Sequence, residues 1–206
     1  MTSPTPGETL PDRPVPRDPS GNEHMESSPV PGAAVPAHHV GPERSIAVDM
    51  LLGAVAGAAG VWAMDRVGWF LYNHEDPAAL EREHQARTGG KDVAHAAIEK
   101  AADMTGINLP TGEPNPAGIA MHYALGVLPG ALYGAARHKV PALRAGNGAL
   151  YGCGLFALMD ETVDPALGIA AGPTHYPWQA HVRGLVSHIV LGITTETVLR
   201  ASDRVR

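Results

Sequence analysis

Four apolar stretches, each long enough to cross a lipid bilayer as an α-helix, follow one another along this chain. They cover approximately residues 46–72, 117–136, 146–169 and 181–199, and Ala, Gly, Val and Leu dominate all four. A spanning helix needs roughly 17 to 25 mostly apolar residues, whereas a helix of a soluble bundle carries a polar stripe along one side. The pattern therefore predicts an all-α membrane protein with four transmembrane helices, and a soluble four-helix bundle is the alternative.

The first 44 residues differ from the rest of the chain in composition. They hold ten of the 19 prolines, together with Ser, Gly and Glu, and almost no large apolar side chains. A segment of this kind cannot bury enough apolar surface to offset the loss of chain entropy on folding. We therefore predict a disordered Pro-rich tail at residues 1–44 and a four-helix transmembrane domain at residues 45–206.

A phrase that begins with Gly-Ala and ends with Met-Asp occurs twice with the same internal spacing, at residues 53–65 and 148–160. Each copy is followed by a second phrase, His-x-x-Leu-Gly, which begins at His122 and again at His188. The repetition predicts two tandem helix-hairpin repeats. Each repeat would place an Asp near the end of its first helix and a His near the start of its second.

The two repeats together predict one polar layer near one surface of the membrane, formed by Asp65, His122, Asp160 and His188. An ionised carboxylate at such a depth is costly unless it is paired, so an intramembrane Asp suggests a functional site. Three interpretations are open. The layer is a set of structural hydrogen-bonded pairs, a path or binding site for protons or small ions, or a site at which the histidines and aspartates bind a transition metal or haem.

Small residues recur at every fourth position of the four spans, in line with the ionisable ones. Such rows let helix backbones approach closely in lipid, where packing drives association. We therefore expect the rows to form a glycine zipper at helix contacts, and the protein to form homo-oligomers through these faces. The rows are Gly53, Gly57, Val61 and Asp65; His122, Gly126, Gly130 and Gly134; Gly148, Gly152, Phe156 and Asp160; and Gly184, His188, Gly192 and Glu196.

Basic residues cluster at one set of span ends, and this bias sets orientation because Lys and Arg stay on the cytoplasmic side. The loop at 73–116 has few basic residues among many acids, and residues 170–180 have none. We predict that both loops are external and both termini cytoplasmic, in a bacterial inner (plasma) membrane. The basic residues are Arg44, Arg137, Lys139, Arg144, Arg200, Arg204 and Arg206.

The long external loop carries its own helix signals. Asp76-Pro77 is typical of a helix start and Gly89-Gly90 of a stop, while Asp92 begins a second helix that ends at Gly106. The second helix is predicted either to lie at the membrane interface or over the mouth of the bundle, or to form part of a solvated hairpin.

Three further ionisable residues are candidates for supporting the layer. Arg66 is expected to extend outward or to pair with Glu161, and Glu196 to pair with Arg137 or Arg200. The chain has no phosphate-binding loop, nucleophile elbow, CxxC pair or HExxH helix. It also has no basic patch outside the membrane flanks that would suit nucleic acid. We therefore expect a non-enzymatic membrane component that handles protons or small ions; a haem- or metal-binding redox subunit and a structural membrane scaffold are the alternatives.

From about Gly53 to Arg200 the chain resembles the YagU family of small bacterial inner-membrane proteins. The resemblance implies an integral membrane protein without an established molecular activity, and it brings no catalytic residues. The Pro-rich tail and the long acidic loop depart from the shorter family pattern. The residues that carry the resemblance are Met64, Asp65, His122, Gly126, Gly130, Tyr133, Gly134, Gly148, Gly152, Pro165, Gly168, Pro177, Trp178, His188 and Glu196.

Overall fold

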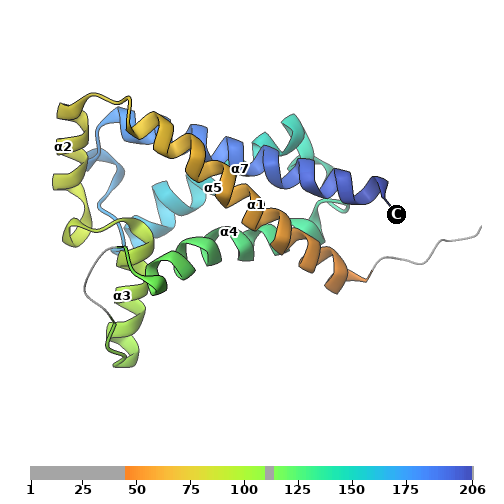
Figure 1. The fold of residues 1–206 in the computed structure, drawn as a ribbon, viewed down its shortest axis with the longest axis horizontal. Helices are drawn as coiled ribbons and strands as arrows, with labels where there is room; N and C mark the ends of the chain where they lie inside the picture. Colours follow the sequence, from red (N-terminus) through yellow and green to blue (C-terminus); the bar gives the residue numbers. More distant parts are fainter. Residues whose placement is uncertain (1–44, 110–113, 206) are drawn as a thin grey trace, which may run out of the picture. The chain divides into compact units, whose positions relative to one another are not determined.

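The computed structural model describes residues 45–109 and 114–205, and every regular element in these residues is helical (Figure 1). The predicted tail at residues 1–44 lies outside them. The all-α class predicted from the sequence is confirmed for the described chain. The α-helices are α1 (Ile46–Tyr72), α2 (Pro77–Ala86), α3 (Val93–Thr105), α4 (Pro116–Ala136), α5 (Ala149–Leu158), α6 (Asp164–Ala166) and α7 (Trp178–Arg204). Three 3-10 turns, at Thr88–Gly90, Pro141–Gly148 and Pro173–His175, and a π-helical turn at Met159–Val163 complete the list.

Three of the helices, α1, α4 and α7, are long and apolar enough to cross a membrane. The predicted span at residues 146–169 is different, because it is divided into α5, the π-helical turn and α6. Pro165 lacks the N–H that an α-helix would direct at the carbonyl of Glu161. The preceding residue, Asp164, instead donates its N–H to the carbonyl of Met159, five residues back.

The helices of the predicted external loop begin and end where their capping residues indicate. The side chain of Asp76 accepts a hydrogen bond from the N–H of Ala78 at the start of α2. Asp92 does the same for the N–H of His95 at the start of α3. Helix α3 ends at Gly106, whose φ of 72° places it in the left-handed conformation that glycine tolerates.

Helix α1 packs along both α4 and α7, and α5 packs along α7. Glycine rows lie at two of these contacts. A Cβ atom at Gly53 would lie 2.2 Å from the carbonyl oxygen of Gly130, and one at Gly192 would lie 2.3 Å from that of Gly148. The rows are therefore in contact within one chain, and the formation of homo-oligomers through the glycine-rich helix faces stays a prediction.

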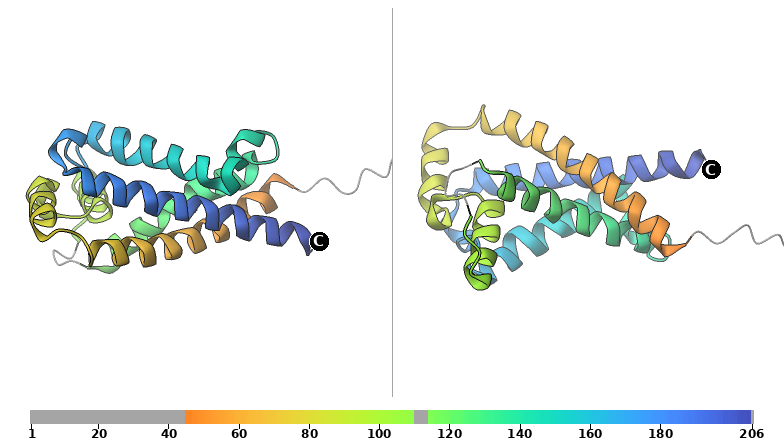
Figure 2. Two further views of the ribbon diagram at one scale, coloured as in Figure 1. Left: turned by 90° about the horizontal axis from the view of Figure 1, so that it is seen from above. Right: turned by 60° about the horizontal axis from the view of Figure 1, so that its bottom comes forward.

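The start of α1 and the ends of α4 and α7 lie at one end of the bundle, which we call the basic end (Figure 2). There Arg137, which follows α4, bonds Asp203 of α7 at 2.8 Å. Lys139 and Arg144 follow in the same connection between α4 and α5. Helices α2 and α3 lie at the opposite end, which we call the cap end, where α2 contacts α7 and α3 contacts α4.

Candidate functional site

The first predicted pair of the polar layer forms directly. His122 Nε2 of α4 donates to Asp65 Oδ1 of α1 over 2.8 Å, and both side chains are part-buried. One turn deeper, Gly126 faces Val61: a Cβ atom at Gly126 would lie 2.1 Å from Val61 Cγ2. The small residue lets the two helices approach, and the close approach places the ionisable side chains of the next turn within hydrogen-bond reach.

The second pair is looser than the first. His188 Nε2 of α7 lies 3.6 Å from Asp160 Oδ1, which is longer than a hydrogen bond. The other ring nitrogen, Nδ1, donates to the carbonyl of Gly184 at 2.9 Å. Asp160 belongs to the π-helical turn, whereas Asp65 lies in a regular α-helix. The same phrase in the sequence thus gives two different local geometries.

Two adjoining cavities meet at this layer. One, of about 470 Å³, is lined by α2, the segment 169–176 and the start of α7, and we call it the cap cavity. The other, of about 560 Å³, is lined by α3, α4 and α5, and we call it the bundle cavity. Both are lined by all four predicted layer residues: Asp65, His122, Asp160 and His188. The layer therefore faces shared space at the cap end.

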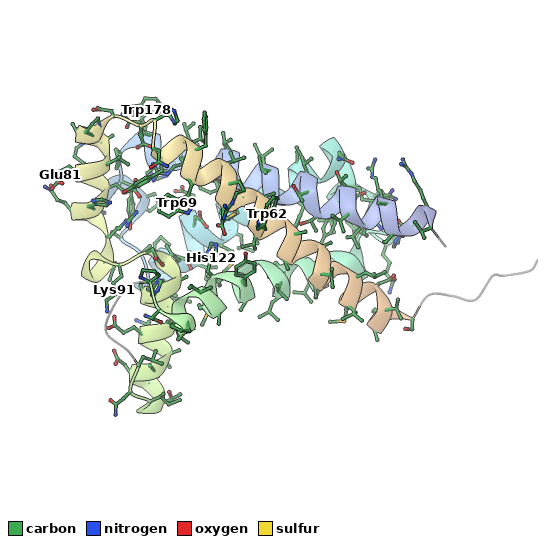
Figure 3. The ribbon with its side chains drawn as sticks, in the orientation of Figure 1. Trp62, Trp69, Glu81, Lys91, His122 and Trp178 are labelled. Carbon is green, nitrogen blue, oxygen red and sulfur yellow. The ribbon has the colours of Figure 1, made fainter. Side chains whose placement is uncertain are left out.

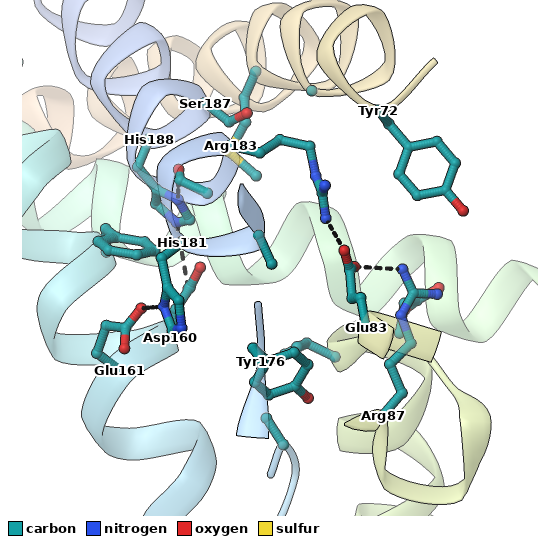
Figure 4. A pocket seen from close by; sticks show the side chains of 18 of the residues that line it. Tyr72, Glu83, Arg87, Asp160, Glu161, Tyr176, His181, Arg183, Ser187 and His188 are labelled. Carbon is teal, nitrogen blue, oxygen red and sulfur yellow. Dashed lines mark hydrogen bonds and ion pairs between the residues drawn. The ribbon is translucent and has the colours of Figure 1, made fainter. Parts of the chain in front are cut away.

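Glu161 does not pair with Arg66, which was one of the two alternatives that the sequence analysis gave for Arg66. It lies 2.6 Å from Nδ1 of His181, and the Nε2 of the same ring lies 3.0 Å from the carbonyl of Pro173 (Figure 4). Arg66 is exposed, and its guanidinium lies over the ring of Trp62. The reason is geometric, since His181 of α7 lies next to the π-helical turn while Arg66 points outward from α1.

A second charged cluster ties α2 to α7 above the cap cavity. Arg183 of α7 binds Glu75 and Glu83, and Arg87 also donates to Glu83 at 2.9 Å (Figure 4). Burial raises the pKa of the Glu83 carboxyl, but the two arginines outweigh burial and hold that pKa below its ordinary value. Sequence reasoning missed this cluster, because residues about 100 positions apart leave no spacing signal.

Glu196 lies in a separate cluster at the basic end and does not join the layer. It is completely buried and pairs with Arg137 at 2.9 Å and with Arg200 at 2.6 Å, the two partners predicted for it. Arg144 and the hydroxyl of Tyr133 also donate to it, at 3.0 and 2.7 Å. These two donors had no signal in the sequence beyond their position near the span ends.

The layer does not have the geometry of a metal centre. Within residues 45–109 and 114–205, no group of three or more His, Cys, Asp or Glu side chains is placed to hold a metal ion. The four candidates His122, His188, Asp65 and Asp160 instead form one closed pair and one open pair. The described arrangement suits the binding of protons or of a small polar ligand better than metal ligation.

No protein-family model, curated protein or solved structure matches this chain. The resemblance to the YagU family therefore stays a prediction, and function is argued from the site alone.

Proposed function

We propose that this protein is an integral bacterial inner-membrane protein of the YagU type that binds protons or small ions in its Asp/His layer, without enzymatic activity. The observation that carries the proposal is the bond between Asp65 and His122 at the wall of two cavities. Histidine changes its charge near physiological pH, and a neighbouring carboxylate adjusts the pH at which it does so.

The outward-facing side chains of the long helices support insertion in a membrane. Trp62, Trp69 and Trp178 are all exposed, and the last two lie towards the cap end, where interfacial tryptophans are expected (Figure 3). Large aliphatic side chains are exposed between the ends. These include Leu51, Val55, Leu128, Leu132 and Leu150. A soluble protein rarely exposes so many of them together.

The same proposal includes four spans arranged as two repeats. Helix α5, the π-helical turn and α6 follow one another without a break from Ala149 to Ala166. At ~1.5 Å per residue this run spans roughly 27 Å, close to the ~30 Å thickness of a hydrocarbon core. The contacts of Gly57 with Gly126 and of Gly152 with Gly192, which occupy equivalent positions in the two phrases, support a repeated helix pair.

Cysteine labelling tests the proposed topology. In a Cys153→Ala background, Glu81→Cys at the cap end should react with an impermeant maleimide added outside intact spheroplasts. Lys139→Cys at the basic end should react only after lysis, because the proposed orientation places the basic end in the cytoplasm. Both positions are exposed, so access to the reagent depends on the side of the membrane alone. Labelling of both from the same side would overturn the topology.

An apolar layer separates the Asp/His pairs from the basic end. Val61, Leu155 and Leu191 pack together next to the polar layer and are nearly fully buried. The buried Glu196 lies beyond them. This order supports proton or ion binding from the cap end in preference to an open pore through the bundle.

Histidine titration tests the proton-handling proposal. In NMR spectra of the protein in lipid nanodiscs, Asp65→Asn should move the titration midpoint of His122 by about one to three pH units, the size of effect that one neighbouring charge produces. His138, at the basic end, should titrate alike in both proteins. Asp103→Asn, which removes an exposed carboxylate of α3, is the matched control and should leave both histidines unchanged. Identical His122 curves in wild type and Asp65→Asn would leave the structural scaffold as the better account.

A further inference from the structure

Hydrogen-bond acceptors converge where the two cavities meet beside His188. Because Nδ1 of His188 donates to the carbonyl of Gly184, the neutral ring carries its lone pair on Nε2. That nitrogen lies 3.6 Å from Asp160 Oδ1. The two atoms are therefore acceptors that face each other, at a separation too long for a direct hydrogen bond. A donor with several N–H groups that approaches from the cavity side can bond both atoms at once.

Two further buried polar side chains line the cavities nearby. Ser187, one residue before His188, is 6% exposed and lines the cap cavity, and its Oγ has no hydrogen-bond partner among the described residues. Asp164 is 4% exposed and lines the bundle cavity, and no ion pair between its carboxylate and a described base is present. Buried polar groups are normally satisfied, so the Ser187 hydroxyl is available to a ligand.

The basic side chains around the cavities are already matched by acids. Arg183 binds Glu75 and Glu83, and Lys91 binds Glu99. An anionic ligand would have to displace one of these carboxylates. A cationic ligand would instead compensate the charge of Asp160 and Asp164, which lie one turn apart on the π-helical turn and α6. Extra turns of π-helix recur at functional sites because they re-aim side chains in this way.

The rest of the lining is apolar and includes aromatic rings. Phe156 lies with its ring centroid 5.6 Å from that of His188, and Trp69 lines both cavities. Faces of Trp and Phe attract ammonium groups as well as apolar carbon. Volumes of about 470 and 560 Å³ fall within the range of small-molecule sites. The remaining apolar walls come from Met64, Leu155, Met159 and Leu191.

We propose that this place is a binding site for a small organic amine, in which an ammonium group binds Asp160 and His188 and an apolar body lies against the aromatic wall. Asp164 adds a carboxylate on the bundle-cavity side and Ser187 a hydroxyl on the cap-cavity side. The proposal rests on the proposed function, because it names a ligand class for the second half of the same layer. A simple inorganic cation fits less well, since the acceptors are accompanied by apolar walls and no metal-binding group is formed by the described residues.

Isothermal titration of the full chain in lipid nanodiscs tests this inference, with empty nanodiscs as the blank. The probes are benzylamine, benzyl alcohol and benzoate, which share a ring and differ in charge. Benzylamine should bind saturably and at least tenfold more tightly than benzyl alcohol, while benzoate should give no saturable heat. Equal binding of the amine and the alcohol would show only partition into apolar space and would overturn the proposal.

The variant Asp164→Asn sharpens the test, because it keeps the shape of the side chain and removes its charge. Benzylamine affinity should fall at least tenfold in this variant and stay within twofold of wild type in Asp103→Asn, whose carboxylate is exposed on α3. The helical circular dichroism signal checks that both variants fold. If Asp164→Asn does not fold, benzylamine binding is measured with Asp160→Asn in its place. Unchanged affinity in both layer variants would also overturn the proposal.

The outcome can be separated from that of the proton-handling test. The latter uses Asp65 and His122 and needs no ligand. If benzylamine binds as expected but Asp65→Asn does not move the titration midpoint of His122, the proposed proton handling alone is overturned. If Asp65→Asn moves the titration midpoint of His122 but benzylamine does not bind, the ligand assignment alone is overturned.

Discussion

Replacing Gly53 with alanine should lower the free energy of unfolding in detergent by about 3 kcal/mol, the upper part of the usual range for overpacking. The new Cβ would lie 2.2 Å from the carbonyl oxygen of Gly130 and 2.9 Å from Cα of Gly134. Both neighbours are backbone atoms, which cannot rotate away as a flexible side chain can. Relief therefore requires α1 and α4 to separate, and the measurement is unfolding by a denaturing detergent followed by circular dichroism.

Gly154→Ala is the matched control for this experiment. Gly154 also lies inside an apolar helix, α5, but a Cβ atom there would meet nothing within 4 Å. Alanine is the better helix former by about 1 kcal/mol, so this variant should be as stable as wild type or slightly more stable. Equal destabilisation by both alanines would mean that the close contact between α1 and α4 does not set the cost.

The same separation should reach the polar layer. Gly53 lies three turns before Asp65 on the same helix face, and the bond between Asp65 and His122 depends on how closely α1 and α4 approach. The glycine row thus sets the distance between α1 and α4, and the bond between Asp65 and His122 depends on that distance. This link explains why the two features share one sequence phrase.

Helical spacing was enough to predict which helix faces meet and which ionisable residues lie on them. A four-residue step places Asp65 on the row of Gly53 and Gly57, and the structure places that row against α4. The same reasoning also predicted homo-oligomers through the glycine faces, which stays a prediction, because spacing along one helix does not identify the partner. The starts of α2 and α3 could be predicted because each depends on a local contact: the side chain of Asp76 or Asp92 accepts a hydrogen bond from a backbone N–H two or three residues later.

The features that the sequence did not predict depend on contacts between distant residues or on backbone detail. Pro165 lies in an apolar stretch that suits a single span, and its effect on the turn before it appears only in the three-dimensional hydrogen-bond pattern. The sequence around Arg183 likewise does not identify its partners Glu75 and Glu83. Glu83 lies in α2, and Glu75 lies just before that helix. Both features contribute side chains to the lining of the cap cavity, and Asp160 of the π-helical turn lies 3.6 Å from His188.

Replacing Glu196 with glutamine should have the largest effect of any single change, a loss of about 3 to 5 kcal/mol in the free energy of unfolding. Glu196 is fully buried, and it compensates Arg137, which is 1% exposed. The neutral amide would leave this guanidinium with Asp203 as its remaining carboxylate partner. Arg144 and Arg200 are partly exposed and can turn to water, so the cost arises mainly at Arg137.

Two further variants isolate that cause. Asp203→Asn removes the more exposed partner of Arg137 and should cost about 1 kcal/mol or less, since this carboxylate is partly exposed and Arg137 keeps Glu196 as its buried partner. Glu196→Leu combined with Arg137→Leu removes both buried charges and should be more stable than Glu196→Gln, because a buried charge is then no longer left without its partner. If the double variant were the least stable of the three, burial of an unpaired charge would not be the cause. Because Val61, Leu155 and Leu191 lie between this cluster and the layer, Glu196→Gln should also leave the His122 titration unchanged in protein that remains folded.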